Sequence, residues 1–341
     1  MSFDPRNILV LDFGQLGDVV LSLPALRAIR ERYPQARISV ASGLAAAPVV
    51  ELSGTADRTL PVDRVGLRDG PKLRSIASIA RLIQQIRRGR FDFVIDLNSL
   101  SETNLLGYLS GAPMRLFSRR RGRSLDFLSN FRPRPAVEDV RKHAVDRYLE
   151  VVFPLGVREV PRVPHLQTRV EDDRAVEEMM KKENADETAP LVGLFSGASD
   201  PDKRWPLARF ADLARRLEAA EGARIVVFAG PEERATIQQL RAAFSESATI
   251  LDRLTLSQLA SAAARMAVFV SNDSGPLHLA AAVGTPVVML LGHPSMESFL
   301  PVGEGHRVIR RTPLSELATD EVYAVVRTAV AAVRPLPKPS R

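Results

Sequence analysis

Short runs of β-branched and aliphatic residues alternate with longer amphipathic segments in the first half of the chain. The segments 17–34 and 72–89 have the apolar spacing of helices. The strand-like runs around them are 7–13 (NILVLDF), 36–42 (ARISVAS), 58–62 (RTLPV), 91–97 (FDFVIDL) and 114–118 (MRLFS). This alternation predicts right-handed βαβ units on a parallel sheet with helices on both faces.

The second half of the chain repeats the pattern. Its strand-like runs are 191–197 (LVGLFSG), 223–230 (ARIVVFAG), 249–251 (TIL), 267–273 (AVFVSND) and 286–292 (PVVMLLG). We therefore expect an α/β protein of two consecutive Rossmann-like domains, with parallel sheets that face each other across a ligand cleft at the carboxyl ends of their strands.

A polar, extended stretch with Pro161 and Pro164 is the best candidate for an interdomain linker. It predicts domains at 1–160 and 166–314. A last helix is expected at 315–333. The basic tail 334–341 that follows it is expected to be disordered.

The composition excludes several classes of site. The chain has 341 residues, 45% of them hydrophobic, which is enough for two cores of ordinary size. No run of about 18 uncharged apolar residues and no signal-peptide pattern occurs, so we expect a cytoplasmic protein. The absence of Cys removes thiolate chemistry, and the five His show no metal-binding spacing. We therefore expect neither a metal nor a cofactor.

The positive charge is concentrated in one segment. The chain carries 47 Lys and Arg against 40 Asp and Glu, and the segment 115–134 holds seven Arg but one acid, Asp126. Such a surface attracts phosphates on nucleic acid, on an anionic membrane or on an acidic substrate. The simpler interpretation is a solvated basic face. We call this segment the basic loop, and its candidate binding residues are Arg119, Arg120, Arg121 and Arg123.

A glycine-containing corner follows the first predicted strand. Gly14 and Gly17 lie three residues apart and Asp18 stands at the start of the helix, but the spacing is not that of a dinucleotide-binding loop. As a first-turn acid, Asp18 would stabilise the helix by roughly 0.5–1 kcal/mol. It could instead accept a proton from a bound hydroxyl group.

Two polar corners follow strands in the second half. A strand ends at Ser196, and the loop after it carries Lys203 ahead of a helix. Glu232 and Glu233 follow the next strand. The simpler interpretations are a solvated lysine and first-turn acids, whereas the functional ones are a phosphate contact and a ribose-hydroxyl acceptor.

A further corner lies at residues 271–278. Asp273, Ser274 and Gly275 stand where a strand leads into a helix N-terminus, which offers free N–H groups to an anion. His278 lies one turn into that helix and can project toward the same end. The simpler interpretation is an ordinary strand-to-helix corner with a capping residue and a surface histidine.

Five segments of the chain share their residues and order with a known family. They are LGDVVLSLPALRAIRERYP, HAVDRYLEVVFPLGV, DKRWPLARFADLARRL, FAGPEE and SNDSGPLHLAAAVGTPVVMLLG. Together they resemble glycosyltransferase family 9, that of the ADP-heptose:lipopolysaccharide heptosyltransferases. The resemblance implies a GT-B fold in which the first domain holds the acceptor, the second holds the nucleotide sugar, and the helix 315–333 returns to the first domain.

The resemblance also implies an activity and partners. These are inverting, metal-independent transfer of heptose, or a related sugar, from a nucleotide-diphosphate donor, with ADP-heptose expected, onto lipopolysaccharide core or a related glycan. The protein would be a monomer that binds no nucleic acid and contacts the cytoplasmic face of the inner membrane peripherally.

The family pattern assigns roles to the polar corners. Asp18 matches the catalytic carboxylate that deprotonates the acceptor hydroxyl, and Gly17 lies on the acceptor side with the basic loop. Lys203 matches the diphosphate-binding lysine, and one of Glu232 and Glu233 the ribose contact. The donor-binding residues implied in this way are Ser196, Lys203, Glu232, Glu233, Asp273, Ser274, Gly275 and His278.

Two other functions are consistent with parts of the pattern. A nucleotide-sugar epimerase of GT-B type would need additional acid and base residues. A non-catalytic protein that binds nucleic acid through its basic loop would leave the polar corners unexplained. That loop also has only Phe117, Phe127 and Phe131 as aromatic neighbours.

Overall fold

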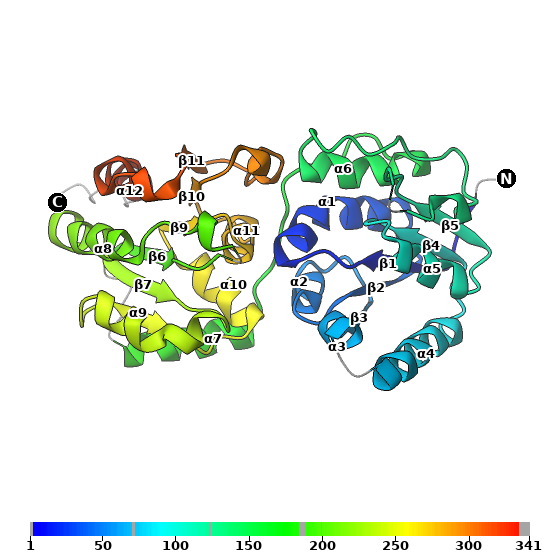
Figure 1. Ribbon diagram of the computed structural model, residues 1–341, viewed down its shortest axis with the longest axis horizontal. Coiled ribbons are helices and arrows are strands. Elements are labelled where there is room, and N and C mark those ends of the chain that lie inside the picture. Colours follow the sequence, from blue (N-terminus) through cyan, green and yellow to red (C-terminus); the bar gives the residue numbers. More distant parts are fainter. Residues whose placement is uncertain (1–2, 70–71, 123, 184–188, 199, 334–341) are drawn as a thin grey trace, which may run out of the picture. The chain divides into compact units, whose positions relative to one another are not determined.

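The computed structural model describes residues 3–69, 72–122, 124–183, 189–198 and 200–333. The chain forms two compact units, Met1–Leu166 and Gln167–Arg341. Figure 1 shows them as the blue-to-green and green-to-red parts of the ribbon. The boundary lies at the end of the stretch that contains Pro161 and Pro164.

The first unit is built on a parallel sheet. Its strands are β1 (Asn7–Asp12), β2 (Arg37–Gly43), β3 (Arg58–Val62), β4 (Phe93–Asp96) and β5 (Met114–Phe117). Their order is β3-β2-β1-β4-β5, and the paired strands are parallel, as the alternating pattern predicted. The chain adds strands on one side of β1 and then crosses to its other side, so the strand order reverses between β1 and β4. In open α/β sheets ligands bind at the carboxyl ends of the strands at such a switch point.

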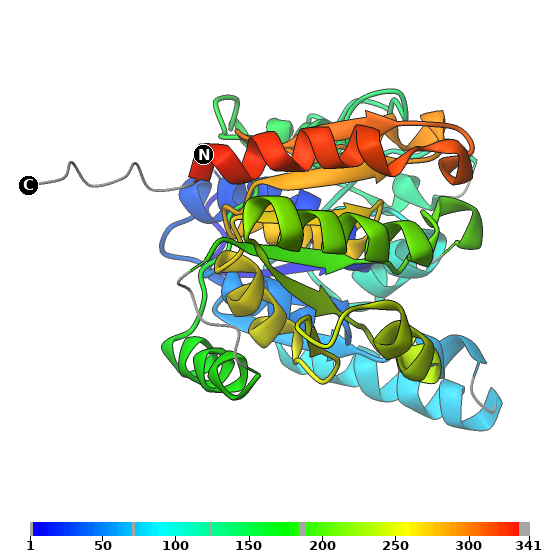
Figure 2. The same cartoon turned by 90° about the vertical axis from the view of Figure 1, so that its left-hand side faces the viewer.

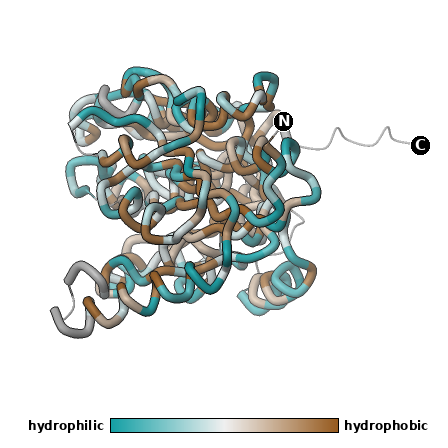
Figure 3. The backbone as a smooth tube through the Cα atoms, turned by 90° about the vertical axis from the view of Figure 1, so that its right-hand side faces the viewer, coloured by the Kyte–Doolittle hydropathy of each residue, from teal (hydrophilic) through white to brown (hydrophobic). Residues whose placement is uncertain are grey.

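Helices cover both faces of this sheet, which explains why four successive residues in the middle of its central strand are apolar. Ile8, Leu9, Val10 and Leu11 are fully buried, as expected for a parallel strand covered on both sides. The helices are α1 (Leu16–Arg32), α2 (Ala47–Leu52), α3 (Arg64–Asp69), α4 (Lys72–Arg88), α5 (Ser101–Leu109) and α6 (Ala144–Val152). Helix α6 packs on α1. In Figure 3, α4 lies at the lower left, and hydrophobic and hydrophilic residues alternate along it.

The second unit repeats this architecture. Its strands are β6 (Leu191–Phe195), β7 (Arg224–Phe228), β8 (Thr249–Leu251), β9 (Val268–Asn272), β10 (Val287–Leu291) and β11 (Arg307–Arg310). Their order is β11-β10-β9-β6-β7-β8, and the paired strands are parallel. Here the order reverses between β6 and β9. Strand β11 was not predicted, because an edge strand with a charged residue at each end lacks the apolar run of a central strand.

The last helix contributes an apolar face to the core of the second unit. The helices of this unit are α7 (Val170–Lys182), α8 (Leu207–Glu221), α9 (Ile237–Ala243), α10 (Leu256–Ala264), α11 (Gly275–Ala282) and α12 (Thr319–Val333). Val322, Val326 and Val330 recur every four residues on α12 and are buried in the core of the second unit. Figure 2 shows α12 alongside α8, which it contacts.

A helix that crosses a membrane must be both long and apolar. In the part of the chain that the structure describes, every helix is too short or too polar to cross a lipid bilayer. The predicted basic tail 334–341 lies outside the described residues.

Candidate active site

Asn272 holds together the carboxyl ends of β6 and β9 at the switch point of the second sheet. Its side-chain amide donates to the carbonyl oxygens of Ser196 at 2.9 Å and Gly197 at 3.4 Å. Its Oδ1 accepts a hydrogen bond from the backbone N–H of Trp205 at 3.0 Å. Asn272 is fully buried, so these bonds fix the loop that carries Lys203 against β9.

Three candidate residues come together at this corner. Lys203 Nζ lies 3.1 Å from Asp273 Oδ2, and His278 Nε2 lies 3.9 Å from Asp273 Oδ1. Burial favours the neutral form of Asp273, but His278 and Lys203 outweigh it and hold the pKa of this carboxyl below its usual value. His278 is only 4% exposed, and its Nδ1 has no hydrogen-bond partner among the described residues. The corner therefore combines the ionised carboxylate of Asp273 with the amino group of Lys203 and the imidazole ring of His278.

Helix α11 begins directly beside this carboxylate. Ser274 is its N-cap, and the Ser274 Oγ accepts a hydrogen bond from the N–H of Leu277 at 3.4 Å. The same oxygen lies 2.8 Å from Ser271 Oγ. Gly275 is the first helical residue and carries no side chain that would cover the helix end. The amides of this first turn can bind the oxygens of an anionic ligand.

The two adjacent glutamates differ in position. Glu232 is exposed, whereas Glu233 folds back over the ends of β6 and β7. Its Oε2 accepts a hydrogen bond from the N–H of Gly230 at 2.9 Å. A Cβ atom on Gly197 would lie 2.2 Å from Glu233 Oε1, so only glycine leaves room for this carboxylate. Of the two predicted ribose contacts, Glu233 is the one at the strand ends.

The switch point of the first sheet carries a buried carboxylate that the sequence analysis did not single out. Asp12 ends β1 and is fully buried, and burial raises its pKa to about 6. Ser22 Oγ donates to its Oδ2 at 2.5 Å. Asn98 Oδ1, beyond β4, accepts a hydrogen bond from the N–H of Phe13 at 2.6 Å. Asn98 thus joins β1 to the segment after β4, as Asn272 joins β9 to the segment after β6.

The predicted base Asp18 lies beside this corner, in the first turn of α1. Its Oδ2 accepts a hydrogen bond from the N–H of Gln15 at 2.9 Å, so it makes the helix-start contact of the simpler interpretation. Gly17 precedes it in the same turn and is partly exposed. The phenol of Tyr148 on α6 has a pKa well above its usual value, first because it is buried and then because Asp18 and Asp12 are negative neighbours. The corner therefore holds two carboxyl groups and a neutral phenol.

Part of the basic loop is neutralised by acids. Arg119 Nε lies 3.5 Å from Asp126 Oδ2, and Arg120 Nε donates to Glu138 Oε2 at 2.7 Å. Arg120 Nη1 also donates to the carbonyl oxygen of Asn98 at 3.1 Å. Glu138 lies after the segment with the excess charge, so the local charge count missed this ion pair. Arg121 is exposed, and Arg123 lies outside the described residues.

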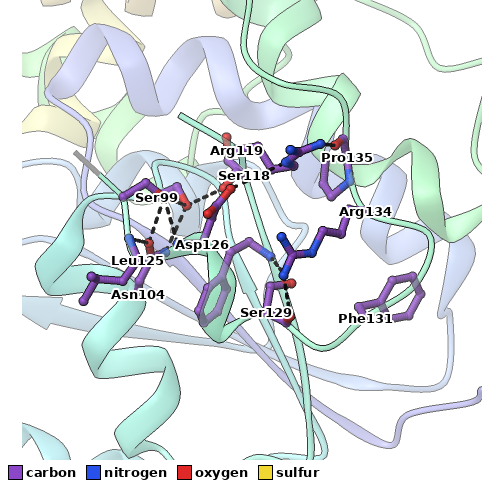
Figure 4. A network of polar contacts seen from close by, with 12 residues as sticks. Ser99, Asn104, Ser118, Arg119, Leu125, Asp126, Ser129, Phe131, Arg134 and Pro135 are labelled. Atoms are coloured by element: carbon purple, nitrogen blue, oxygen red, sulfur yellow. Dashed lines mark hydrogen bonds and ion pairs between the residues drawn. The ribbon is translucent and has the colours of Figure 1, made fainter. Parts of the chain in front are cut away.

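Hydrogen bonds anchor the start of the basic loop to the end of β4. Ser99 Oγ donates to the carbonyl oxygen of Ser118 at 2.5 Å, and Asn104 Nδ2 donates to Ser99 Oγ at 2.9 Å. Asn104 Oδ1 accepts from the N–H of Leu125 at 2.9 Å. Figure 4 shows these residues converging with Arg119 and Asp126. Residues 118 and 125 of the basic loop are therefore held beside the switch point of the first sheet.

A metal-binding arrangement would show as a cluster of suitable side chains. Within residues 3–333, apart from the short segments not described, no group of three His, Asp or Glu is placed to hold a metal ion.

The sequence analysis missed four residues that support the candidates: Asp12 and Asn272, which are buried, and Asn98 and Tyr148, which are partly buried. Asp12 and Asn272 lie within predicted strands, Asn98 directly follows one, and Tyr148 lies on α6. One signal was available, because Asp12 is a charged residue at the end of an apolar run. Tyr148 carried no such signal, since its position depends on the packing of α6 on α1.

Comparison with known proteins places this geometry in a family. The profile of glycosyltransferase family 9 (heptosyltransferase) matches residues 79–322. The chain is 27% identical over 315 residues to lipopolysaccharide heptosyltransferase 2 of Salmonella typhimurium, an alignment that covers 89% of this chain and 88% of the relative.

Solved structures share the fold. The glycosyl transferase of family 9 from Veillonella parvula superposes with a TM-score of 0.85 at 24% identity, covering 97% of this chain and 99% of its own. The E. coli ADP-heptose lps heptosyltransferase II superposes with a TM-score of 0.79 at 22% identity, and the match covers 96% of this chain and 100% of the E. coli chain. The predicted GT-B class, with two parallel-sheet α/β domains, is thus confirmed. Since the family profile spans most of the chain, this protein belongs to glycosyltransferase family 9 and is a glycosyltransferase.

Proposed function

We propose that this protein is a lipopolysaccharide heptosyltransferase that uses ADP-heptose as its donor, binds the donor through the second unit and binds an anionic lipopolysaccharide-type acceptor through the first. The observation that carries the proposal is the meeting of Lys203, Asp273 and His278 at the β6–β9 switch point of a family 9 chain. The names of the similar proteins support heptose as the sugar and ADP as the nucleotide.

The donor corner has the chemistry needed for a departing diphosphate. As the anomeric carbon–oxygen bond breaks, negative charge develops on the diphosphate, and catalysis requires that charge to be stabilised. Lys203 supplies a positive charge, and the first turn of α11 supplies backbone N–H groups. Glu233 at the strand ends is suited to accept a hydrogen bond from a ribose hydroxyl. We propose that these groups act without a metal ion.

The first unit supplies the base in this proposal. The acceptor hydroxyl oxygen attacks the anomeric carbon opposite the departing diphosphate, which inverts the configuration. The Asp18 carboxylate takes the hydroxyl proton, and ADP leaves with the electron pair of the broken bond. Tyr148 stays protonated at neutral pH, because its pKa is raised, and can donate a hydrogen bond near Asp18. Exposed Arg121 and the basic loop are suited to an anionic acceptor.

The proposed surroundings follow from the acceptor. A lipopolysaccharide precursor is a membrane lipid, so we propose that the protein acts as a monomer in peripheral contact with the cytoplasmic face of the inner membrane. Family membership favours transfer over the epimerase and nucleic-acid-binding alternatives.

The test is a transfer assay with purified protein, ADP-heptose and lipopolysaccharide from a heptose-deficient strain. We expect release of ADP together with an acceptor that gains the mass of one heptose. Lys203→Ala should lower kcat/KM at least tenfold, whereas Lys182→Ala, an exposed lysine on α7, should not change it. Heptose transfer that is absent with ADP-heptose but present with another nucleotide sugar would overturn the donor assignment. Epimerisation of the sugar without transfer would favour the epimerase.

A further inference from the structure

A groove on the first unit gathers arginines far along the chain from the basic loop. It has a volume of about 520 Å³ and is lined by Arg58, Arg81, Gln84, Gln85, Arg88 and Gly89. Arg58 is the first residue of β3, and the other side chains come from the second half of α4 and its end. We call it the arginine groove. Its lining consists almost entirely of hydrogen-bond donors with three fixed positive charges, which is the composition of an anion site.

The arginine groove is separate from the candidate active site. Arg58 stands at the amino end of its strand, and α4 runs back from the carboxyl end of the sheet to Arg88, just before β4. The groove therefore lies toward the amino ends of the strands, whereas Asp12 and Asp18 lie at a carboxyl end. Since substrates of α/β sheets bind at the carboxyl ends, this groove is not part of the donor or acceptor site.

The charges of the groove have no partners in the part of the chain that the structure describes. Among the described residues, Arg58, Arg81 and Arg88 form no ion pair and no side-chain hydrogen bond, and all three are exposed. Arg119 and Arg120 of the basic loop differ from these three arginines, because each of them forms an ion pair with an acid. The dipole of α4 explains a basic residue in its last turn, such as Arg88. It does not explain Arg81 a full two turns earlier or Arg58 on another element.

Guanidinium groups bind phosphate oxygens with two parallel hydrogen bonds, and several together bind them strongly. We propose that the arginine groove binds the phosphate groups of anionic lipids and thereby docks the first unit on a membrane surface. A bilayer with anionic lipid has many phosphates and a negative surface potential, which suits three neighbouring cations at an exposed edge. The assignment rests on the proposed membrane contact and names the surface that makes it.

The test measures binding to vesicles without nucleotide sugar, so it is independent of the transfer assay. Wild-type protein should sediment with vesicles of phosphatidylcholine containing about 30% phosphatidylglycerol and not with phosphatidylcholine alone. The variant R58Q/R81Q/R88Q should bind about 100-fold more weakly at low salt, because each arginine near an anionic surface contributes about fivefold. The difference should disappear in about 0.5 M NaCl, where the charges are screened.

A matched control has the same loss of charge on the second unit. The variant R174Q/R215Q/R307Q removes three exposed arginines there and should bind the anionic vesicles as the wild type does. Circular dichroism establishes that both variants are folded. Equal loss of binding in both variants would mean that net charge alone matters, and undiminished binding by R58Q/R81Q/R88Q would place the membrane contact elsewhere. Either result overturns the proposal, as would saturation of the groove by millimolar inorganic phosphate without binding to vesicles.

Discussion

Replacing Lys203 by Met tests whether Lys203 and Asp273 form one energetic unit in the free protein. The two charged atoms lie 3.1 Å apart, and the side chains are 23% and 13% exposed. At an effective dielectric constant of about 20, this separation bounds the attraction at about 5 kcal/mol. Desolvation offsets part of that, and a hydrogen bond to a charged group contributes roughly 1.5–3 kcal/mol net. We expect Lys203→Met to lower the free energy of unfolding by about 2 kcal/mol for these reasons.

The assay is urea unfolding followed by circular dichroism at pH 7. Lys203→Met, Asp273→Asn and the double variant complete a cycle, and we expect a coupling energy of roughly 1.5–3 kcal/mol. Lys182→Met, which removes an exposed lysine, should change stability by less than about 0.5 kcal/mol. A coupling energy within about 0.5 kcal/mol of zero would refute the reasoning.

The dependence on pH gives a second check of the same pair. The folded-state pKa of Asp273 is below its usual value, so ionised Asp273 contributes stability above the unfolded-state pKa. That contribution is lost as the pH falls through the folded-state pKa. The stability difference between wild type and Lys203→Met should therefore be largest near neutral pH and shrink below about pH 4. A difference that is the same at pH 3 and pH 7 would mean that Lys203 stabilises the fold through contacts other than this carboxylate.

Three further outcomes are expected. Asp18→Asn should lower kcat about 10²–10⁴-fold with little change in donor affinity, and turnover within about tenfold of wild type would contradict a general base. Gly197→Ala should raise the KM for the donor, because the added Cβ displaces the Glu233 carboxylate, while Gly43→Ala, whose Cβ would make only an ordinary contact, serves as a control for glycine replacement away from this corner. Since burial raises the pKa of Asp12 to about 6, the neutral form is favoured on folding, and stability falls as the pH rises from about 4 through about 6. We expect the decrease in the free energy of unfolding between pH 4 and pH 7, measured by urea titration, to be about 3 kcal/mol smaller in Asp12→Asn than in the wild type. The same decrease in both proteins would show that Asp12 ionises freely.

The sequence predicted the parts of the molecule that depend on local pattern. The apolar runs located β1 and β9, because strands buried on both faces are nearly continuous runs of apolar residues. The polar residues after the apolar runs of β6 and β9 made Lys203, Asp273 and His278 candidates, since the carboxyl ends of parallel strands meet at one edge of a sheet. Their meeting at one corner follows from the strand order, which brings β6 next to β9.

Features that depend on tertiary packing could not be predicted in this way. Glu138 pairs with Arg120 across 18 positions, so a count of charges within the basic loop misses it. The apolar face of α12 indicated a buried helix but not which core it enters. Tyr148 approaches Asp18 only because α6 packs on α1, and amphipathic spacing does not choose between neighbouring helices.

The packing of α12 has a consequence for dissecting the protein. Trp205 donates its indole N–H to the carbonyl oxygen of Leu317 at 2.9 Å, so the segment that leads into α12 also supports the loop that carries Lys203. A fragment of the second unit that stops at the end of β11 would lack α12. It would expose the core residues that Val322, Val326 and Val330 cover, and Trp205 would lose its hydrogen bond to Leu317. An expression clone meant to isolate nucleotide binding should therefore begin before α7 and retain the chain through Val333, and affinity tags belong beyond that residue.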